Sequence, residues 1–313
     1  MILDPVWADC FRRARLASAR LIMDTNQGRV VASDGQVHRN DVLLVEFEKE
    51  GKRTRFFIKR SSYVSVRKIF KRVFRGGFFP PSKVRKEYSN LKRLQRLGFD
   101  VPELIGYGEE RRWGALLLEV LVTREIPDVF GLDFLIQKWL PSQPPRRQRE
   151  VRRRLLERLA DVTRRMHACG FEHHDCFFRN LMVSKDDLDR VFILDCPRGS
   201  WWPTCLMSWR GQLDLATLDA ASGAFCSRTD RLRFFLRYRQ HRRLTGRDKR
   251  MIRKVLDRAA PMRERQLIRL RRFLRVNASE DAGDSKPANL EKLANLMVEP
   301  DACHAENQEH PRL

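Results

Sequence analysis

Four residues between positions 173 and 195 have the types and spacing of a phosphoryl-transfer site. Asp175 follows His173 by two positions, Asn180 follows Asp175 by five, and Asp195 ends a short apolar run. In the pattern H-x-D-x-x-x-x-N, the aspartate accepts the proton of the attacking hydroxyl, while the asparagine and a later aspartate bind magnesium. We therefore expect Asp175 to act as the base and His173 to brace its loop. Asn180 and Asp195 are the expected magnesium ligands.

A predicted β-hairpin would bring the two metal ligands together. Residues 181–183 and 191–194 are apolar and partly β-branched, and a polar stretch separates them. Asn180 would begin one strand and Asp195 would end the other, so that their oxygen atoms could share a hard cation. The alternative is an ordinary hairpin whose acidic residues are solvated.

A lysine and a glutamate upstream have the pattern of an ion pair that contacts nucleotide phosphates. Lys59 follows the apolar run 56–58, as a phosphate-binding lysine does at the end of a buried strand. Glu87 falls on the apolar face of a helix predicted over about 83–97. A carboxylate on an inward face needs a partner, and Lys59 is the candidate. Alternatively, Lys59 lies at a sheet edge and Glu87 pairs with neighbouring surface lysines.

Further elements would position this group. Residues 4–19 predict a basic helix, and residues 28–60 and 115–122 predict β-strands. A phosphate-binding loop would fall within 28–35, although this region contains no G-x-G-x-x-G. Residues 123–126 would connect two lobes, and an adenine could meet backbone groups there. After the long helix that ends before Gly170, a later helix would carry Asp214 either as a brace for the catalytic loop or as a helix cap.

Composition and charge limit the classes of protein that the chain can be. Its 313 residues suffice for one large domain or two lobes, and the formal net charge is +23. Residues 277–313 carry a net charge of −5, so the body before them carries +28, which attracts polyanions. No apolar run approaches the roughly 18 residues of a membrane-spanning helix, and no secretory signal is evident. The 7 scattered cysteines fit a reducing compartment, so we expect a cytoplasmic protein.

Taken together, the motifs resemble the lipopolysaccharide kinases, the group of core heptose kinases and Kdo kinases that share the protein-kinase-like fold. The resemblance covers roughly residues 28–260. The matching motifs lie at residues 57–60, 81–88, 98–102, 121–125, 166–177, 195–199, 214–216 and 229–234.

The resemblance implies a bilobal α+β fold, with an antiparallel sheet and one helix in the N-lobe and a mainly helical C-lobe. On this basis we expect an N-terminal basic helix in 1–27, the N-lobe in 28–122 and the C-lobe with basic helices in 123–276. The acidic tail, 277–313, is expected to be disordered.

The resemblance also implies ATP and Mg²⁺ as phosphoryl donor and metal, and a sugar hydroxyl of the lipopolysaccharide inner core (heptose or Kdo) as acceptor. Lys59, held by Glu87, would bind the ATP phosphates, and the segment around Glu125 would bind the nucleotide. Only 18 residues separate Asp195 from Asp214, which favours a small or glycan acceptor over a protein.

The chain also departs from the related patterns. His174 stands where protein kinases carry arginine, and residues 196–197 (Cys-Pro) replace Phe-Gly. Asn180 stands where heptose kinases often have histidine. These departures leave the identity of the acceptor open.

The family implies work on the cytoplasmic face of the inner membrane. Residues 228–276 hold 19 arginines and lysines against four acids, interleaved with apolar positions, and therefore predict basic amphipathic helices. We expect an anionic inner-membrane surface as a partner of these helices and of four N-terminal arginines. Those arginines are Arg12, Arg13, Arg15 and Arg20.

Three alternatives remain open. A nucleic-acid-binding protein would account for the basic body, but no recognised binding module is present, so we expect no specific nucleic acid partner. A protein kinase or a pseudokinase could share the fold, although a pseudokinase would lack a metal ligand and none is missing. A zinc site would use nearby cysteines and histidines, although no C-x-x-C pair is present. Its ligands would be Cys169, His173, His174 and Cys176.

Overall fold

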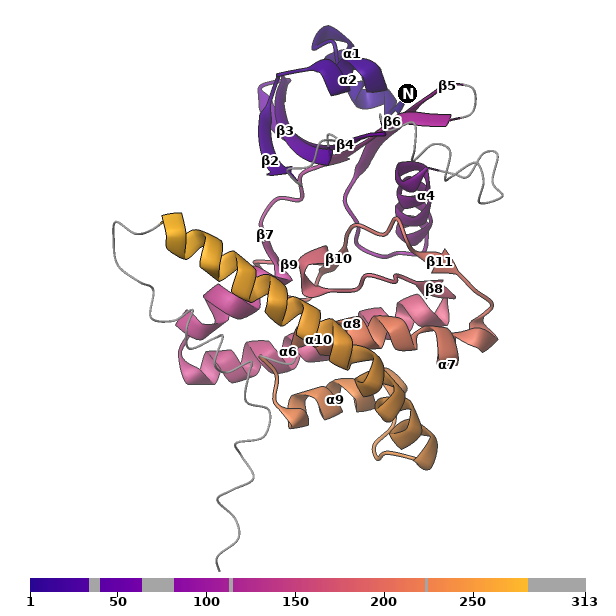
Figure 1. The fold of residues 1–313 in the computed structure, drawn as a ribbon, viewed down its shortest axis with the longest axis vertical. Coiled ribbons are helices and arrows are strands. Elements are labelled where there is room, and N and C mark those ends of the chain that lie inside the picture. Colours follow the sequence, from indigo (N-terminus) through magenta and orange to yellow (C-terminus); the bar gives the residue numbers. More distant parts are fainter. Residues whose placement is uncertain (34–39, 64–81, 113–114, 223–224, 281–313) are drawn as a thin grey trace, which may run out of the picture. The chain divides into compact units, whose positions relative to one another are not determined.

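The computed structural model describes residues 1–33, 40–63, 82–112, 115–222 and 225–280, and its contacts divide the chain into two units (Figure 1). Unit 1 comprises Met1–Leu132, His173–Asp175 and Arg179–Trp201. Unit 2 comprises Asp133–Glu172, Cys176–Phe178 and the chain from Trp202 onward. Most of the segment 173–201, which the sequence predicted in the C-lobe, therefore makes its contacts within unit 1.

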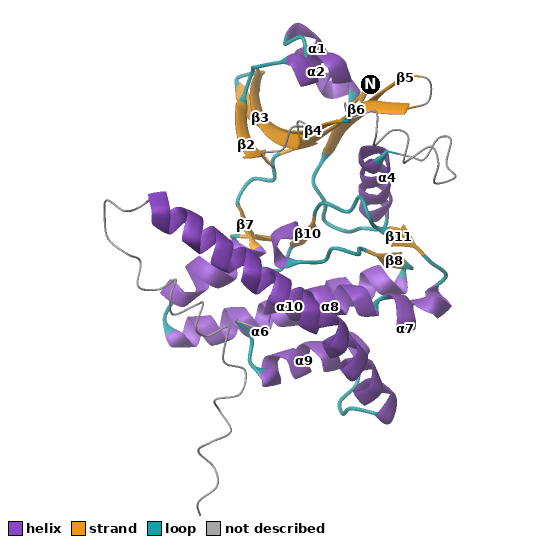
Figure 2. Ribbon diagram, viewed as in Figure 1, coloured by secondary structure: helices purple, strands orange, loops and turns teal. Residues whose placement is uncertain are grey.

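Unit 1 is built on an antiparallel sheet with the strand order β1-β5-β6-β4-β3-β2 (Figure 2). The loop between β3 and β4 has positive φ at Glu50 (54°) and Gly51 (72°), as a tight type I′ hairpin requires. Along β4, Phe56, Ile58 and Arg60 are buried on one face, so Lys59 points to the other. The strands are β1 (Ile2–Leu3), β2 (Arg29–Ser33), β3 (Asn40–Lys49), β4 (Lys52–Ser62), β5 (Leu104–Arg112) and β6 (Ala115–Arg124).

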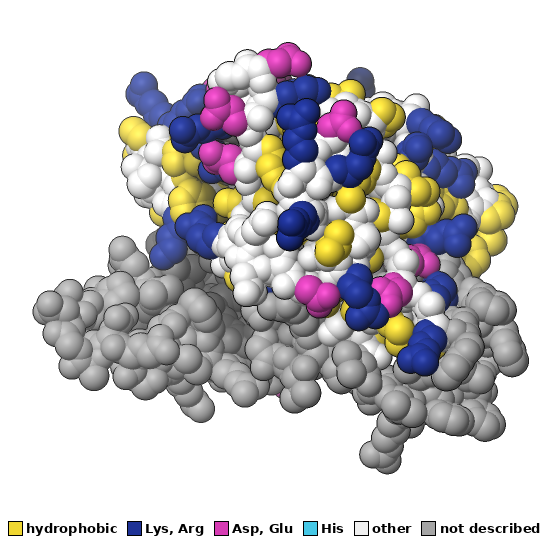
Figure 3. Space-filling view, turned by 90° about the horizontal axis from the view of Figure 1, so that it is seen from above, with side chains coloured by type: hydrophobic (Ala, Val, Ile, Leu, Met, Phe, Trp, Pro, Cys, Tyr) yellow, Lys and Arg dark blue, Asp and Glu magenta, His cyan; other side chains and the backbone are white. Residues whose placement is uncertain are grey.

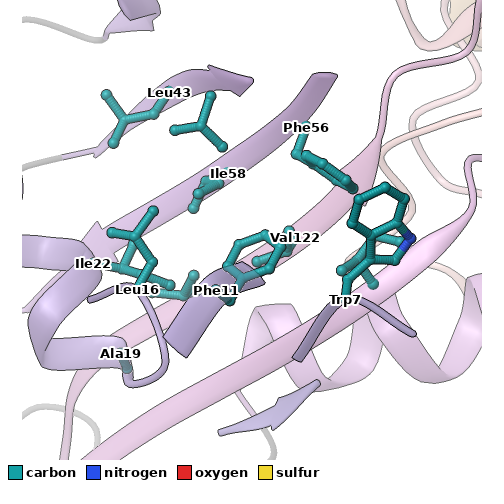
Figure 4. Close-up of a cluster of buried hydrophobic side chains, with 12 residues drawn as sticks. Trp7, Phe11, Leu16, Ala19, Ile22, Leu43, Phe56, Ile58 and Val122 are labelled. Carbon is teal, nitrogen blue, oxygen red and sulfur yellow. The ribbon is translucent and has the colours of Figure 1, made fainter. Parts of the chain in front are cut away.

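Two short helices cover one face of this sheet. The sequence predicted one helix to about Ala19, but α1 (Pro5–Arg13) ends before Arg15, which has a φ of 57°. Ser18 then caps α2 (Ala19–Asp24) by accepting a hydrogen bond from the N–H of Leu21. The prediction of a single helix was therefore wrong, because a left-handed residue breaks the helical hydrogen bonding. Apolar side chains from both helices pack on strands β3, β4 and β6 (Figure 4).

The other face of unit 1 carries the elements of the predicted site. Helix α4 (Lys83–Arg96) confirms the helix predicted over 83–97, and Ser82 is its N-cap. Strands β9 (Leu181–Ser184) and β10 (Val191–Ile193) form the predicted antiparallel hairpin, with Leu181 opposite Ile193. Strand β7 (Val129–Gly131) extends this small sheet beside β9, while β11 (Ser200–Trp201) lies further along the chain.

Unit 2 is mainly helical, and its core lies between α6, α8, α9 and α10. The capping box of Ser227 and Asp230 begins α9, and α10 continues beyond the predicted boundary at 276. Of the helices that the structure describes, none has the length and apolar character needed to cross a membrane. The longer elements are α6 (Pro145–Ala168), α8 (Gln212–Ser222), α9 (Arg228–Arg239) and α10 (Gly246–Glu280). The short ones are α5 (Leu132–Phe134), a π-helix (Leu135–Trp139), 3₁₀ turns (Leu140–Ser142, Phe178–Asn180 and Thr204–Leu206), β8 (Phe171–Glu172) and α7 (Met207–Arg210).

Candidate active site

One lysine ammonium group lies between two carboxylates in unit 1. The Lys59 Nζ atom is 3.1 Å from Oε2 of Glu87 and 2.6 Å from Oδ1 of Asp195. Strand β4 presents Lys59 on the face opposite the α1–α2 core, and α4 presents Glu87 from its buried side. The predicted pairing of Lys59 with Glu87 is therefore present, and Asp195 joins it.

Burial sets the electrostatics of this group. The Glu87 residue is only 4% exposed, and burial raises the pKa of its carboxyl group to about 7, an effect that the charge of Lys59 only partly offsets. Burial by itself lowers the pKa of Lys59, but the charges of Glu87 and Asp195 outweigh it and raise that pKa above its usual value. Lys59 therefore stays positively charged near neutral pH and can bind an anion.

His173 holds the loop that carries Asp175. Its ring is buried, and Nε2 lies 2.9 Å from the backbone oxygen of Leu194. The N–H of Asp175 donates to Nδ1 of His173 at 3.3 Å, which makes Nε2 the protonated nitrogen of a neutral ring. The bracing role predicted for His173 is consistent with these two contacts.

The carboxylate of Asp175 is held from two sides and remains 24% exposed. Asn180 donates its amide N–H groups to the backbone oxygen of Asp175 at 2.8 Å and to Oδ2 at 3.2 Å. Arg179 Nη2 lies 2.9 Å from Oδ1 and 3.2 Å from Oδ2. Arg179 was not among the residues predicted from the sequence, and the structure places its positive charge beside the predicted base.

Two residues of this region have left-handed backbone geometry. His174 has a φ of 68° and Asp195 has a φ of 48°, a conformation that costs free energy for residues other than glycine. His174 directly precedes Asp175 in the chain, and the carboxylate of Asp195 contacts Lys59. Such strain concentrates at functional sites, where the surrounding contacts hold the backbone in place.

The predicted magnesium ligands lie on adjoining ends of the β9–β10 hairpin. The N–H of Leu194 donates to the backbone oxygen of Asn180 at 2.9 Å, which places Asn180 beside the residue that precedes Asp195. The amide nitrogen of Asn180 is engaged with Asp175, so its side-chain oxygen is the atom left for a metal. Oxygen donors of this kind fit Mg²⁺, which takes one or two protein ligands and completes its shell with water and phosphate oxygens.

The zinc alternative lacks support. Both ring nitrogens of His173 are engaged with the backbone, and the thiol of Cys169 donates to the backbone oxygen of Met166. Within the described ranges, no three or more histidine, cysteine, aspartate or glutamate side chains form a group that could hold a metal ion. The arrangement therefore does not fit tetrahedral zinc.

The sequence also singled out Glu125, Asp214 and the region from Gly28 to Gly35, and the structure gives each a different environment. Glu125 pairs through Oε2 with Arg55 Nε at 2.7 Å, and its backbone N–H donates to the Arg55 oxygen, so neither group is free for a nucleotide. Asp214 is fully buried in unit 2, where its Oδ2 lies 3.2 Å from Nε2 of His167. Gly28 has a φ of 88° and precedes β2, whereas Gly35 lies outside the described residues.

Two curated proteins are similar to this chain in sequence. Lipopolysaccharide core heptose(I) kinase WaaP of Pseudomonas aeruginosa is 28% identical over 224 residues, which are 67% of this chain and 78% of that protein. The Escherichia coli (strain K12) protein of the same name is 23% identical over 171 residues, covering 53% and 62% of the two chains.

The solved structure "WaaP in complex with acyl carrier protein" superposes with a TM-score of 0.54 at 23% identity, covering 81% of this chain and 97% of that one. The predicted protein-kinase-like α+β fold is thereby confirmed. A model of the "Lipopolysaccharide kinase (Kdo/WaaP) family" matches residues 23–234. The chain therefore belongs to the Kdo/WaaP family of lipopolysaccharide kinases.

Proposed function

We propose that this protein is an ATP-dependent kinase that phosphorylates a sugar hydroxyl of the lipopolysaccharide inner core. The observation that carries the proposal is the position of Lys59 Nζ between Glu87 and Asp195, on the unit that also holds Asp175 and Asn180. Membership of a lipopolysaccharide kinase family supports the choice of a sugar acceptor.

The candidate residues of unit 1 have separate roles in the proposed reaction. Lys59, oriented by Glu87, binds oxygens of the ATP phosphates, and Asp195 and Asn180 hold the magnesium ion. That ion, when bound, neutralises charge on the phosphates. Asp175 orients the acceptor hydroxyl and accepts its proton as the oxygen attacks the γ-phosphorus and the bond to the β-phosphate oxygen breaks. Arg179, held against Asp175, supplies a further positive charge beside the attacking group.

The acceptor can be tested directly with labelled ATP. Heptose- and Kdo-containing core fractions, free sugars and generic proteins would each be incubated with the purified protein, alongside a reaction without acceptor. We expect transfer to the core fractions and to no protein. Label found only on added protein, or only on the kinase itself, would overturn the proposed acceptor.

A second part of the proposal is that an anionic membrane surface holds the enzyme at the cytoplasmic face of the inner membrane. Two of the N-terminal arginines are engaged in ion pairs, because Arg12 lies 2.7 Å from Asp9 and Arg20 pairs with Glu110. On the face in Figure 3, Lys and Arg side chains lie among acidic ones. The N-terminal arginines therefore contribute less free positive charge than their number implies.

The end of α9 and the start of α10 provide a better candidate for the membrane contact. Four basic side chains there are exposed and have no ion pair with any residue that the structure describes. Each is worth about 1 kcal/mol near an anionic surface at low salt. They are Arg242, Arg243, Lys249 and Arg250.

The solved relative suggests a protein partner. That WaaP structure is a complex with an acyl carrier protein. Unit 2 of the present chain contains a cavity of about 880 Å³ between α6, α8, α9 and α10. The wall is largely apolar, and its polar part includes the arginines Arg228, Arg231 and Arg263. We propose that an acyl carrier protein binds here with its acyl chain in the cavity.

The carrier-protein proposal predicts that acyl-loaded and unloaded carrier protein stabilise the kinase to different extents. An acyl-loaded carrier protein should raise the unfolding temperature of the kinase by mass action, and the unloaded carrier should raise it less. Val255→Trp, which fills the cavity, should remove the difference. An equal response to both forms would contradict the proposal.

A further inference from the structure

Asn90 lies one turn beyond Glu87 on the buried face of α4 and is only 4% exposed. Its Nδ2 atom donates to the backbone oxygen of Cys196 at 2.9 Å and to that of Gly199 at 3.1 Å. Its Oδ1 atom accepts a hydrogen bond from Nε1 of Trp201 at 2.9 Å. One buried side chain therefore holds three groups of the segment that directly follows Asp195.

The segment 196–201 has a second attachment to α4. The guanidinium carbon of Arg93 lies 3.7 Å from the ring centroid of Trp201, within the range of a cation–π contact. The N–H of Gly199 donates to the oxygen of Cys196 at 3.1 Å and closes a turn. The backbone after Asp195 is therefore folded against the same helix that presents Glu87.

Helix α4 is itself fixed to the sheet. The N–H of Val84 donates to Oε2 of Glu119 at 3.2 Å, and Glu119 is only 1% exposed. A buried carboxylate at a helix N-terminus is favoured by the helix dipole. The rings of Tyr88 and Tyr107 also pack with their centroids 4.6 Å apart. Helix α4 can therefore act as a rigid link between the sheet that carries Lys59 and the segment that follows Asp195.

We propose that Asn90 is a positioning residue for Asp195, which it holds beside Lys59 and Glu87 through the backbone that follows Asp195. The proposal rests on the proposed function, in which Asp195 holds magnesium. Asn90 acts through the backbone of Cys196, the residue joined to Asp195, and it touches neither the nucleotide nor the acceptor. Hydrogen bonding by its amide, rather than its volume, is therefore what matters.

The main test replaces the amide by an apolar group of similar size, Asn90→Leu, which removes the hydrogen bonds of Asn90 to Cys196 O, Gly199 O and Trp201 Nε1. We expect kcat to fall by about 10–100-fold, as small misplacements of a reacting group do. We also expect ATP binding to require a higher Mg²⁺ concentration, while KM for the acceptor stays the same. Trp201→Phe removes the indole donor but leaves the Asn90 hydrogen bonds to Cys196 and Gly199, so it should have a smaller effect on both quantities.

Two further variants separate positioning from stability. Asn90→Asp keeps the shape but loses both N–H donors, so it should reproduce the Mg²⁺ effect and serves as the test if Asn90→Leu does not fold. Leu94→Val removes one methylene from the buried side of the same helix and should lower the unfolding temperature without changing the Mg²⁺ dependence. An unchanged Mg²⁺ dependence and kcat in folded Asn90→Leu or Asn90→Asp would overturn the proposal.

The outcome can be distinguished from a failure of the proposed function. ATP binding by the unmodified protein is first measured by calorimetry with and without Mg²⁺ and without any acceptor. No Mg²⁺-dependent binding in that protein would contradict the kinase assignment itself. Mg²⁺-dependent binding that both Asn90 variants retain unchanged would contradict the positioning role alone.

Discussion

Lys59 and Asp195 are separated by 136 positions in the chain, yet their Nζ and Oδ1 atoms lie 2.6 Å apart. The contact joins strand β4 to the end of the β9–β10 hairpin, and both elements belong to unit 1. Glu87 shares the same ammonium group at 3.1 Å. The proposed phosphate-binding lysine and the proposed metal-binding carboxylate are thus within hydrogen-bonding distance of each other.

Asp175→Ala should separate nucleotide binding from transfer. We expect ATP affinity to stay within about twofold and kcat to fall by about 10²–10⁴-fold, the usual contribution of a positioned general base. Single-turnover transfer and calorimetric ATP binding would be measured on the same preparation. Asp186→Ala, an exposed acid in the turn after β9, is the matched control and should keep full activity. Turnover near that of the unmodified protein in Asp175→Ala would remove this residue from the mechanism.

The two proposed metal ligands should have unequal effects. Asp195→Ala should abolish Mg²⁺-dependent ATP binding, because a charged ligand and a partner of Lys59 are lost together. Asn180→Ala should weaken that binding less, because the lost ligand is neutral. ATP binding would be titrated at several Mg²⁺ concentrations. Equal ATP affinity with and without Mg²⁺ in the unmodified protein would contradict both assignments, and full zinc occupancy would revive the zinc alternative.

Glu87 should make stability depend on pH in a defined direction. Its pKa rises from an ordinary value of 4.5 to about 7 in the folded protein, so between these values the folded state binds more protons than the unfolded state. The contribution of Glu87 is therefore greatest below about pH 4.5 and is lost as pH rises through 7, by on the order of 3 kcal/mol. Glu87→Gln cannot ionise and should flatten this dependence.

The pH prediction is checked by thermal unfolding of both proteins between pH 5 and 8. The unfolding temperature of the unmodified protein should fall relative to Glu87→Gln as pH rises. Glu87→Asp, which still ionises, is the control and should keep a slope of the same sign. Parallel curves for the unmodified protein and Glu87→Gln would show that Glu87 has no raised pKa.

Neutralising the four exposed basic residues at the end of α9 and the start of α10 should reduce membrane binding. Replacing Arg242, Arg243, Lys249 and Arg250 by glutamine should lower binding to anionic vesicles by up to about 10³-fold, since each of the four charges contributes about 1 kcal/mol. Co-sedimentation would compare anionic and neutral vesicles over a range of salt, because screening should weaken the attraction.

A control with the same change in charge makes the membrane test specific. Glutamine at four exposed basic positions of unit 1 should reduce vesicle binding less than the α10 change does. These positions are Lys52, Lys83, Arg85 and Arg96. Tight binding to nucleic acid at physiological salt, with no binding to anionic vesicles, would favour the nucleic-acid alternative.

Local sequence patterns predicted the elements that carry the site. The apolar stripe of 83–97 places Glu87 inward and gives α4, because a period of 3.6 residues defines one helix face. The two apolar runs around 181–194 gave the β9–β10 hairpin in the same way, through burial and hydrogen bonding within a short stretch of chain. The motif pattern also singled out Lys59, Asp175 and Asn180.

The N-terminal region shows where local patterns were insufficient. The sequence predicted one helix to Ala19, whereas a left-handed Arg15 divides α1 from α2. The side chains of both helices pack on the sheet. The sheet residues in that core are Leu43, Val45, Phe56, Ile58, Ile105, Val120 and Val122. A single straight helix would satisfy the local pattern, but the burial of both apolar faces depends on the shape of the sheet.

The sequence by itself determined the helical and strand periodicity around the site and the types of group that can act there. Only the tertiary structure decided that Lys59 contacts Asp195, that Arg179 contacts Asp175 and that Asn90 holds the backbone of Cys196. Hydrophobic periodicity indicates which face of a helix or strand is buried, because the period is set by residues only a few positions apart. Which polar groups meet across 106 or 136 positions depends on how the elements pack, since a buried or partly buried polar group must find a partner in the folded protein.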